Sequence, residues 1–383
     1  MERGAKYKVA GIGLGRAGTG RVRAYDVHPL CQVEAVVDSD LANLDLASRR
    51  FGVPGYADCE SMFSAHRIDI VVASLPVRAN YEVVMASTRA GVRAIVTEKP
   101  LTARLAEADE MVAACVEAGI QFAAGLVSWN RRNHQAARDL IQAGEIGDVR
   151  RINIYEANLQ GGCHGINLAR HFAGDAEVKQ VIGWTKGEAA SDYEDAHAGR
   201  EHDPGFQALG GYLRFANGIE AFSSYEPVGW RGFEVIGTRG MLLKRSTPDL
   251  KVRLFRAPET VEEVVFDAFE EVEVPDVEPP PPGGYDAEGW AILSDGMVRS
   301  AAAVVDSLES GSPVQLTTGD DLRKALEICI ALRESARRDQ VPVELPLADR
   351  GLVMYPQNSR WNYKKEILGE EAYMQALAAQ RSE

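Results

Sequence analysis

The chain has 383 residues, of which 45% are hydrophobic and 26% charged, and its formal net charge is −14. This composition is typical of a globular protein, and the length predicts more than one domain. The acidic charge argues against nucleic acid or an anionic membrane as a partner, since both require basic patches.

Cysteine usage and the N-terminus bear on the compartment. The five cysteines are scattered and show no C-x-x-C spacing, so the sequence predicts neither a disulfide framework nor a metal site. The N-terminal residues form no apolar signal segment, and no apolar run reaches the roughly 18 residues of a membrane span. We therefore expect a cytoplasmic protein.

The first third of the chain alternates short apolar runs with helix-like stretches. Strands are predicted at residues 8–12, 33–37, 70–74, 94–97 and 121–124. Helices are predicted at residues 17–26, 42–51, 61–66, 80–90 and 105–118. This alternation indicates parallel βαβ units in a doubly wound sheet. Residues 1–127 are therefore expected to form an α/β domain of the Rossmann type.

The pattern changes near residue 128. Partly alternating segments favour strands of a large, open, mostly antiparallel sheet, at residues 151–159, 179–187, 211–215, 219–225, 232–236, 250–256 and 261–273. Helices are predicted at residues 132–143, 165–172, 287–309 and 319–338. Residues 274–284, with four consecutive prolines, are expected to form an extended loop, and residues 355–383 an amphipathic tail. Residues 128–383 thus read as an α+β domain.

A glycine motif lies at the first strand–helix junction. Gly13, Gly15 and Gly18 form a G-x-G-x-x-G, and Asp38 ends the next strand twenty residues after Gly18. The glycines allow a tight turn, a close approach to a pyrophosphate and close helix–strand packing, and the carboxylate can bind a ribose diol. We therefore predict a dinucleotide site. The alternative is a glycine-rich turn in an α/β domain that binds no nucleotide.

The same segment bears on the choice of cofactor. The loop residues Arg16 and Ala17 are included in the predicted site, because they open the helix that faces the phosphates. Asp38 and Asp40 stand together without a nearby arginine, which favours NAD over NADP. Arg16 could still contact a phosphate, so the preference is not decisive.

Three local signatures then occur in order: residues 12–18, the Glu-Lys-Pro-Leu of residues 98–101, and the Gly-Glu-Ile-Gly of residues 144–147. Together they resemble the glucose–fructose oxidoreductase / inositol dehydrogenase (Gfo/Idh/MocA) family over nearly the whole chain. The resemblance implies a nucleotide-binding domain followed by an open-faced sheet domain. It also implies NAD or NADP, a small carbohydrate or polyol substrate at the seam, and a homodimer or homotetramer built through the open sheet.

Lys99 is the first catalytic candidate. It follows the strand at residues 94–97, at the carboxyl edge where doubly wound sheets place ligands. An ammonium there can polarise the oxygen of the reacting carbon and stabilise developing negative charge, and the resemblance implies the same role. Glu98 and Lys99 are also assigned to the cofactor loop, and Pro100 favours an extended conformation at Lys99. The alternative is a solvated surface lysine.

His164 is the candidate for proton transfer, since imidazole titrates near neutral pH. The surrounding segment resembles a family stretch in which a histidine opens a helix. The family carboxylates four residues before and three residues after that histidine are replaced here by Gln160 and Asn167. A neutral amide cannot tune a histidine as a carboxylate does. The alternative is a helix-capping or packed histidine, and we expect His171 to be structural.

Further site residues are implied by the resemblance. Ser74, Leu75 and Pro76 resemble the family loop over the nicotinamide ribose. Asn80 stands where the family usually has a histidine, although a helix N-cap is the alternative. Substrate contacts are expected from Asn130 and Arg131, together with Gln160 and Asn167.

Several other residues are weaker candidates. His197 and His202 lie in a polar segment. A sugar ring could also pack on a tryptophan, although core packing is the better explanation for each tryptophan alone. The tryptophans considered are Trp129, Trp184, Trp230 and Trp290.

These observations predict an oxidoreductase that moves hydride between a nicotinamide and a hydroxyl-bearing carbon of a sugar, glycoside or cyclitol. Two alternatives stay open. One is a lyase, epimerase or glycosidase reaction that proceeds through transient oxidation by a retained NAD, which the missing carboxylates allow. The other is a regulator that binds the dinucleotide without catalysis.

Overall fold

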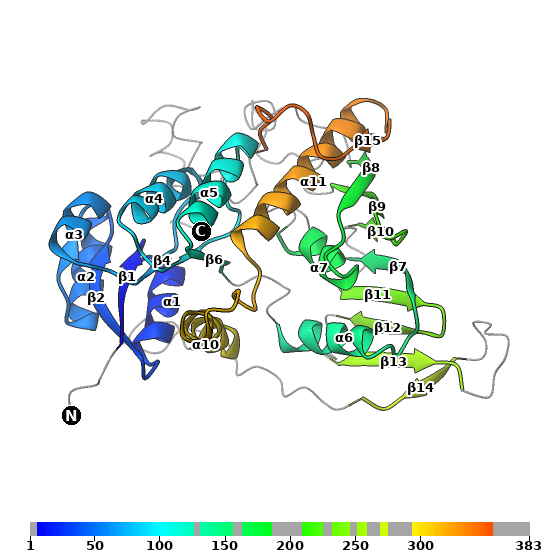
Figure 1. Cartoon of the computed structure of the whole chain (residues 1–383), viewed down its shortest axis with the longest axis horizontal. Coiled ribbons are helices and arrows are strands. Elements are labelled where there is room, and N and C mark those ends of the chain that lie inside the picture. Colours follow the sequence, from blue (N-terminus) through cyan, green and yellow to red (C-terminus); the bar gives the residue numbers. More distant parts are fainter. Residues whose placement is uncertain are drawn as a thin grey trace, which may run out of the picture.

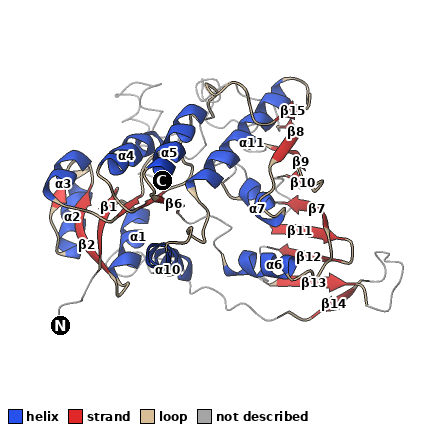
Figure 2. Cartoon of the chain, viewed as in Figure 1, coloured by secondary structure: helices blue, strands red, loops and turns tan. Residues whose placement is uncertain are grey.

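The computed structural model describes residues 6–125, 131–155, 163–185, 209–224, 232–245, 251–258, 269–274 and 293–354. These residues form two separate sheets, each with helices packed on it (Figures 1 and 2). The predicted α/β class, with a parallel Rossmann sheet and a second, mostly antiparallel sheet, is confirmed. No helix in the described ranges has the length and apolar character needed to cross a bilayer.

The first sheet has six parallel strands in the order β3-β2-β1-β4-β5-β6. Its strands are β1 Tyr7–Ile12, β2 Cys31–Val37, β3 Gly55–Tyr56, β4 Ile70–Ala73, β5 Ala94–Thr97 and β6 Gln121–Ala124. The strand order reverses between β1 and β4. In open α/β sheets the crevice at that reversal, beyond the carboxyl ends of the strands, is where ligands bind.

Helices connect these strands: α1 Arg16–Asp26, α2 Leu41–Phe51, α3 Cys59–Ala65, α4 Val77–Arg89 and α5 Leu105–Glu117. Their ends follow local sequence chemistry. The Asp40 side chain caps α2 by accepting hydrogen bonds from the backbone of Ala42 and Asn43, and Asp58 caps α3 in the same way. Such caps satisfy backbone donors that have no partner within the helix.

The second sheet has the strand order β14-β13-β12-β11-β7-β10-β9-β8-β15. Its strands are β7 Val149–Ile154, β8 Val178–Trp184, β9 Gly210–Phe215, β10 Glu220–Ser223, β11 Gly232–Gly237, β12 Gly240–Arg245, β13 Val252–Arg256, β14 Glu270–Val272 and β15 Val343–Glu344. All neighbours are antiparallel except β7 and β10, which run parallel.

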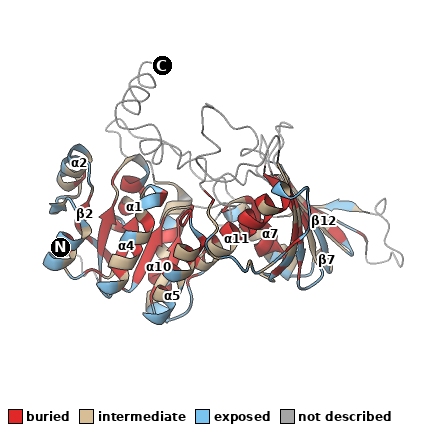
Figure 3. Ribbon diagram, turned by 90° about the horizontal axis from the view of Figure 1, so that it is seen from above, coloured by how far each residue is buried: buried red, intermediate tan, exposed pale blue. Residues whose placement is uncertain are grey.

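One face of the second sheet is covered by α6 Arg132–Gln142, α7 Gly165–Phe172 and α11 Gly319–Arg337. Figure 3 shows α7 and α11 on the same side of this sheet. Phe233 on β11 contacts the rings of His134 from α6 and Phe172 from α7, so these two helices pack on the same side. Helix α11 contacts both β8 and α5. It therefore connects the second sheet to the first.

Helix α10, Asp295–Ser310, lies on the first sheet beside α1, although it follows the second sheet's main strands in sequence (Figure 1). Its Ala301, Val304 and Val305 join a buried apolar cluster with residues of β1, β2 and α1. The division at residue 127 remains a prediction.

The C-terminal described segment also returns to the first sheet's side. β15 pairs with β8, and the chain then runs antiparallel to the segment that leads into α5. The Leu105 amide donates to the carbonyl of Leu352 at 3.1 Å, and the Met354 amide to that of Ala103 at 2.8 Å. We call residues 345–354 the return segment.

The sequence pattern does not predict β12, nor the two-residue strands β3 and β15. In β12 the inward positions are Gly240, Leu242 and Lys244, and Lys244 is only 3% exposed. A buried lysine and an apolar outward neighbour remove the alternation that marks a half-buried strand. β3 has two residues, too few for a pattern. The predicted loop at 274–284, apart from residue 274, and the predicted tail at 355–383 lie outside the described residues.

Candidate functional site

Two of the motif glycines are required by packing. Gly13 has a φ of +78°, and a Cβ there would lie 2.5 Å from the carbonyl oxygen of Ser74. A Cβ at Gly18 would overlap the carbonyl oxygen of Gly13. The turn after β1 therefore closes against the loop after β4 only with glycine at both positions.

Gly15 differs from them, because a Cβ at Gly15 would meet no atom within 4 Å. Gly15 is the N-cap of α1, no side chain caps this helix end, and its first turn holds no acidic residue. Backbone N–H groups at a helix N-terminus attract anions. Open space in front of uncapped N–H groups fits the pyrophosphate of a dinucleotide.

Asp38 anchors the glycine loop. Its Oδ2 accepts a hydrogen bond from the Leu14 amide at 2.6 Å, and its Oδ1 accepts one from the Asp40 amide at 2.9 Å. A carboxylate has about four acceptor positions, so both oxygens retain capacity for a ribose diol. Asp38 can therefore hold the loop and bind a ribose at the same time.

The loop after β4 lies across the strand-order reversal from the glycine loop. The Ser74 amide donates to the carbonyl of Ile12 at 2.8 Å, which ties this loop to the end of β1. A Cβ at Gly13 would lie 2.8 Å from the Leu75 side chain. Pro76 is the N-cap of α4, which begins at Val77 rather than at residue 80.

Asn80 is therefore inside α4, and its interpretation as an N-cap is wrong. The residue is 1% exposed. Its Nδ2 donates to the carbonyl oxygens of Pro100 and Leu101 at 3.1 and 3.0 Å, with a longer contact to Glu98. Asn80 thus fixes the backbone of the loop that carries Lys99.

Lys99 extends from the end of β5, and its side chain is 18% exposed. Its Nζ lies 4.0 Å from Oε2 of Glu98. Glu98 itself forms an ion pair with Arg21 of α1, and Arg21 Nη1 donates to Ser74 Oγ at 2.9 Å. Side chains from α1 and from the loops after β4 and β5 therefore meet at one edge of the first sheet.

Arg21 was missed by sequence reasoning. The one available signal is its position three residues after Gly18, which puts it one helical turn further along the same face of α1. From the sequence alone, an arginine at this position is equally consistent with a solvent-exposed surface residue. Only the meeting of α1 with the loops after β4 and β5 reveals its partners.

His164 is the N-cap residue of α7, but its side chain makes no capping hydrogen bond, and it is half-buried. Asn167, in the first turn of α7, is fully buried. Its Oδ1 accepts from Arg170 at 3.0 Å, and Arg170 also donates to Asp321 Oδ1 at 2.9 Å. The Asn167 amide is thus part of an internal network between α7 and α11, and its role as a substrate ligand stays a prediction.

His171 is buried at the end of α7, where its Nδ1 lies 2.7 Å from Asp175 Oδ1. Burial alone would raise the pKa of Asp175, but its hydrogen bond with His171 and the charges of His171, Arg138 and Arg170 lower that pKa to about 2. His171, Asp175 and Asp321 lie within 4.8 Å of one another. Guanidinium groups already pair with both carboxylates, so we assign the cluster a structural role.

The structure also describes Arg131 and Trp184, which belong to elements of the second sheet and its helices. Arg131 is exposed at the N-cap of α6, and Trp184 ends β8. The side chain of Arg16 lies outside the described parts of the structure. The same holds for the whole of Asn130, Gln160, His197, His202, Trp129, Trp230 and Trp290.

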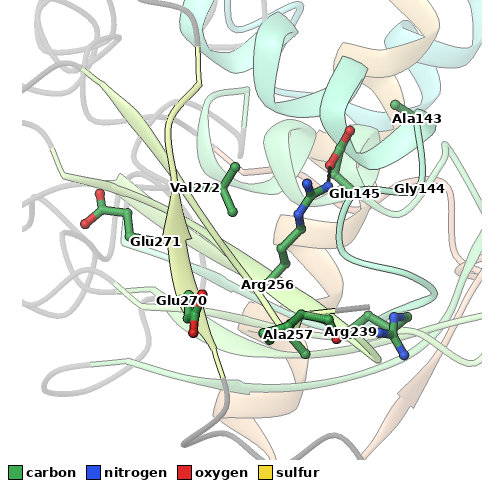
Figure 4. Close-up of a pocket in the computed structure, with 10 residues that line it drawn as sticks. Ala143, Gly144, Glu145, Arg239, Arg256, Ala257, Glu270, Glu271 and Val272 are labelled. Carbon is green, nitrogen blue, oxygen red and sulfur yellow. Dashed lines mark hydrogen bonds and ion pairs between the residues drawn. The ribbon is translucent and has the colours of Figure 1, made fainter. Parts of the chain in front are cut away.

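A pocket of about 450 Å³ lies elsewhere, between the end of α6 and strands β13 and β14 (Figure 4). Arg256 and Glu145 form an ion pair on its wall, and Arg239 and Glu270 also line it. None of its lining residues belongs to the predicted site. The charges on its wall are mixed, so the pocket indicates no particular ligand.

Comparison with known proteins agrees with this geometry. Residues 7–126 match the family model described as an oxidoreductase family with an NAD-binding Rossmann fold, Gfo/Idh/MocA. Among solved structures, levoglucosan dehydrogenase in complex with NADH matches with a TM-score of 0.68 at 20% identity, over 89% of this chain and 99% of that one. An Agrobacterium radiobacter oxidoreductase in complex with NAD+, L-tartaric acid and magnesium matches at a TM-score of 0.68 and 18% identity, over 89% and 98% of the two chains.

Curated relatives match over shorter stretches. 1,5-Anhydro-D-fructose reductase of Ensifer adhaerens is 31% identical over 196 residues, which are 47% of this chain and 57% of the relative. D-Apiose dehydrogenase of Paraburkholderia graminis is 28% identical over 193 residues, covering 44% and 50%. The chain thus spans about half the length of the curated relatives it matches. Residues 7–126 are thus similar to the NAD-binding domain of the Gfo/Idh/MocA family of oxidoreductases.

Proposed function

We propose that this protein is an NAD-dependent oxidoreductase that transfers hydride between nicotinamide and a hydroxyl-bearing carbon of a sugar, glycoside or cyclitol. The observation that carries the proposal is the meeting of three loops at the strand-order reversal. The glycine loop packs against the Ser74 loop, and Arg21 of α1 joins the Ser74 loop to the Lys99 loop.

The dinucleotide would be held by the residues around that reversal. The N-terminus of α1 and Gly15 would face the pyrophosphate, Asp38 the adenosine ribose, and Ser74 with Leu75 the nicotinamide ribose. The nicotinamide supplies or accepts the hydride when it is bound. The paired acids Asp38 and Asp40, without an arginine beside them in sequence, favour NAD over NADP.

Lys99 would donate a hydrogen bond to the oxygen on the reacting carbon, and so stabilise negative charge there as the C–H bond changes. His164, at the start of α7, would accept or return the hydroxyl proton. The similar proteins support a carbohydrate substrate, since they include a levoglucosan dehydrogenase, a 1,5-anhydro-D-fructose reductase and a D-apiose dehydrogenase.

The test is NADH formation, followed by absorbance at the nicotinamide band, with a panel of sugars, anhydro-sugars, glycosides and inositols. Lys99→Met keeps the length of the side chain without its charge, and we expect it to lower kcat about 100-fold or more. Lys8→Met is the matched control, because Lys8 is 52% exposed and pairs with Glu34, away from the proposed site.

Net NADH formation that Lys99→Met abolishes and Lys8→Met preserves would support the proposal. If product forms, or solvent deuterium enters the sugar, without net NADH, the reaction belongs to the retained-cofactor class instead. NAD binding without turnover of any substrate in the panel would favour a regulator.

A further inference from the structure

We infer that Arg21 is a positioning residue that keeps Glu98 away from Lys99. The inference rests on the proposed role of Lys99 at the reacting oxygen. It concerns a side chain on α1 that the glycine motif does not include.

Arg21 joins two loops through separate nitrogen atoms. Nη1 donates to Ser74 Oγ at 2.9 Å, and Nη2 forms the ion pair with Oε1 of Glu98. The side chains of Arg21 and Glu98 are only 12% and 13% exposed. Solvent therefore screens this pair less than it screens a surface salt bridge.

Gly125, just after β6, lies beside the same carboxylate oxygen that pairs with Arg21. A Cβ at Gly125 would lie 2.5 Å from Glu98 Oε1 and 3.1 Å from the carbonyl oxygen of Thr97. Only a glycine there leaves room for the carboxylate in this position. Gly125 thus allows Glu98 to reach Arg21.

Lys99 is a second cation within reach of Glu98. Its Nζ lies 4.0 Å from Oε2, at the outer limit of an ion pair. Because the attraction between two charges rises as solvent is excluded, a Glu98 without Arg21 would draw the ammonium closer. The ammonium would then be shared between Glu98 and the substrate oxygen.

The backbone does not offer another way to relieve this competition. Asn80 donates hydrogen bonds to the carbonyls of Pro100 and Leu101, so the loop stays in place whether Glu98 pairs with Arg21 or with Lys99. The geometry therefore assigns Arg21 a role in freeing the Lys99 side chain, beyond any role in fixing the loop.

A double-mutant cycle separates the two roles. We expect Arg21→Gln to lower kcat about tenfold or more, with a smaller change in KM for NAD, because misplacing the polarising group acts on the reacting atoms. Arg21→Gln/Glu98→Gln removes the competing carboxylate and should recover at least about threefold of that loss. Arg21→Lys keeps the positive charge and should retain more activity than Arg21→Gln.

The matched control is Arg49→Gln, since Arg49 pairs with Asp45 on the exposed surface of α2. It should leave kcat unchanged. A double variant no more active than Arg21→Gln alone would overturn the inference, because it would mean that Arg21 acts only by supporting the fold.

A second readout does not depend on catalysis. Lys99 is acylated with a water-soluble N-hydroxysuccinimide ester, and its labelling relative to Lys8 is measured by peptide mass spectrometry. We expect slower labelling of Lys99 in Arg21→Gln than in the unmodified protein, and recovery in the double variant. Equal labelling in all three would contradict the inference.

These readouts also distinguish the two proposals. If no substrate is turned over but the labelling follows the expected order, the proposed function fails while the Arg21–Glu98 relation holds. If Lys99→Met abolishes turnover but neither readout responds to Arg21→Gln, the function holds and the inference about Arg21 fails.

Discussion

At the scale of single residues, Gly15 and Gly18 belong to one motif but answer to different constraints. A Cβ at Gly18 overlaps the backbone of Gly13, whereas a Cβ at Gly15 meets nothing. Gly15 also has a φ of −62°, which alanine adopts without strain. Gly18 is therefore required for folding, whereas Gly15 leaves space for a ligand.

We therefore expect Gly15→Ala to keep its thermal stability, because alanine at a compatible position does not destabilise the native state. It should weaken NAD binding about tenfold, or about 1.4 kcal/mol. Gly18→Ala should instead lower the free energy of unfolding by about 2 kcal/mol or more through overpacking. Calorimetric titration with NAD measures the affinity, and urea unfolding measures the stability of both variants. Unchanged NAD affinity in Gly15→Ala would contradict the pyrophosphate assignment.

Asp175 provides a pH-dependent prediction. Its pKa of about 2 lies below the ordinary value of 3.8, so its contribution to stability is complete above about pH 4 and lost as pH falls toward 2. Since the carboxylate is 37% exposed, solvent screening limits that contribution to about 1 kcal/mol. Asp175→Asn, which tolerates the local φ of +59°, should lose this amount at pH 7.

Urea unfolding at pH 7 and pH 3 measures the difference between Asp175→Asn and the unmodified protein. The difference should shrink at pH 3. Asp148→Asn is the control, because the Asp148 side chain is 80% exposed and pairs only loosely with Arg150. A difference that grows at low pH would show that the sign of the argument is wrong.

Local signals account for what could be predicted about the site. The glycines and Asp38 act within one βαβ unit, so their spacing is visible in sequence. Arg21 reaches Ser74 across 53 positions, and the Asn80 side chain serves a loop twenty residues away. These contacts depend on how β1, β4 and β5 stand side by side, which no local pattern encodes.

At the scale of elements, the packing of α11 on the second sheet depends on a glycine. A Cβ at Gly183 of β8 would overlap the carbonyl of Leu332 in α11. The Gly183 amide also donates to Ser335 Oγ at 2.9 Å. The helix backbone can approach this strand only because the strand has no side chain there.

Gly183→Ala should therefore lower the free energy of unfolding by about 3 kcal/mol, because a helix backbone cannot yield as a flexible side chain can. Urea unfolding measures the change. Gly351→Ala is the control, since a Cβ at Gly351 meets only the Asp349 side chain at 3.1 Å. If Gly183→Ala unfolds like the control, α11 is free to shift outward and the close approach is not needed.

The elements could mostly be predicted from periodicity. All five long strands of the first sheet lie where apolar runs separate helix-like stretches. Strand β12 could not be predicted in this way, because a buried lysine, Lys244, occupies an inward position. The predicted start of α4 was three residues too late. Pro76 is the N-cap, and the Asn80 side chain binds the backbone of another loop instead of capping the helix.

At the scale of the whole molecule, the return segment links the two sheets. Arg350 donates to both oxygens of Asp109 on α5, at 2.6 and 2.7 Å, and pairs with Glu327 on α11. Glu327 also accepts from the Leu347 amide at 2.9 Å. One guanidinium thus ties the return segment to a helix of the first sheet and to the helix that spans both.

We expect Arg350→Met to lower the free energy of unfolding by about 2 kcal/mol, because Glu327 is nearly buried and loses a cation. The amides of Leu105 and Met354 should exchange faster with deuterium, since the segment they join is released. Arg150→Met is the control, because Arg150 is 67% exposed. No change in exchange at these two amides would show that the return segment is held independently of Arg350.

Helix α10 has a consequence for synthesis on the ribosome. The apolar face formed by β1, β2 and α1 is completed by Ala301, Val304, Val305, Val314 and Leu316. These residues are made long after β6, which ends at Ala124. At 5–20 residues per second, roughly 10–40 seconds separate the two events. During that interval the nascent first sheet presents an uncovered apolar face. Aggregation is therefore most favoured while the second sheet is being translated, and a chaperone would be most useful at that stage.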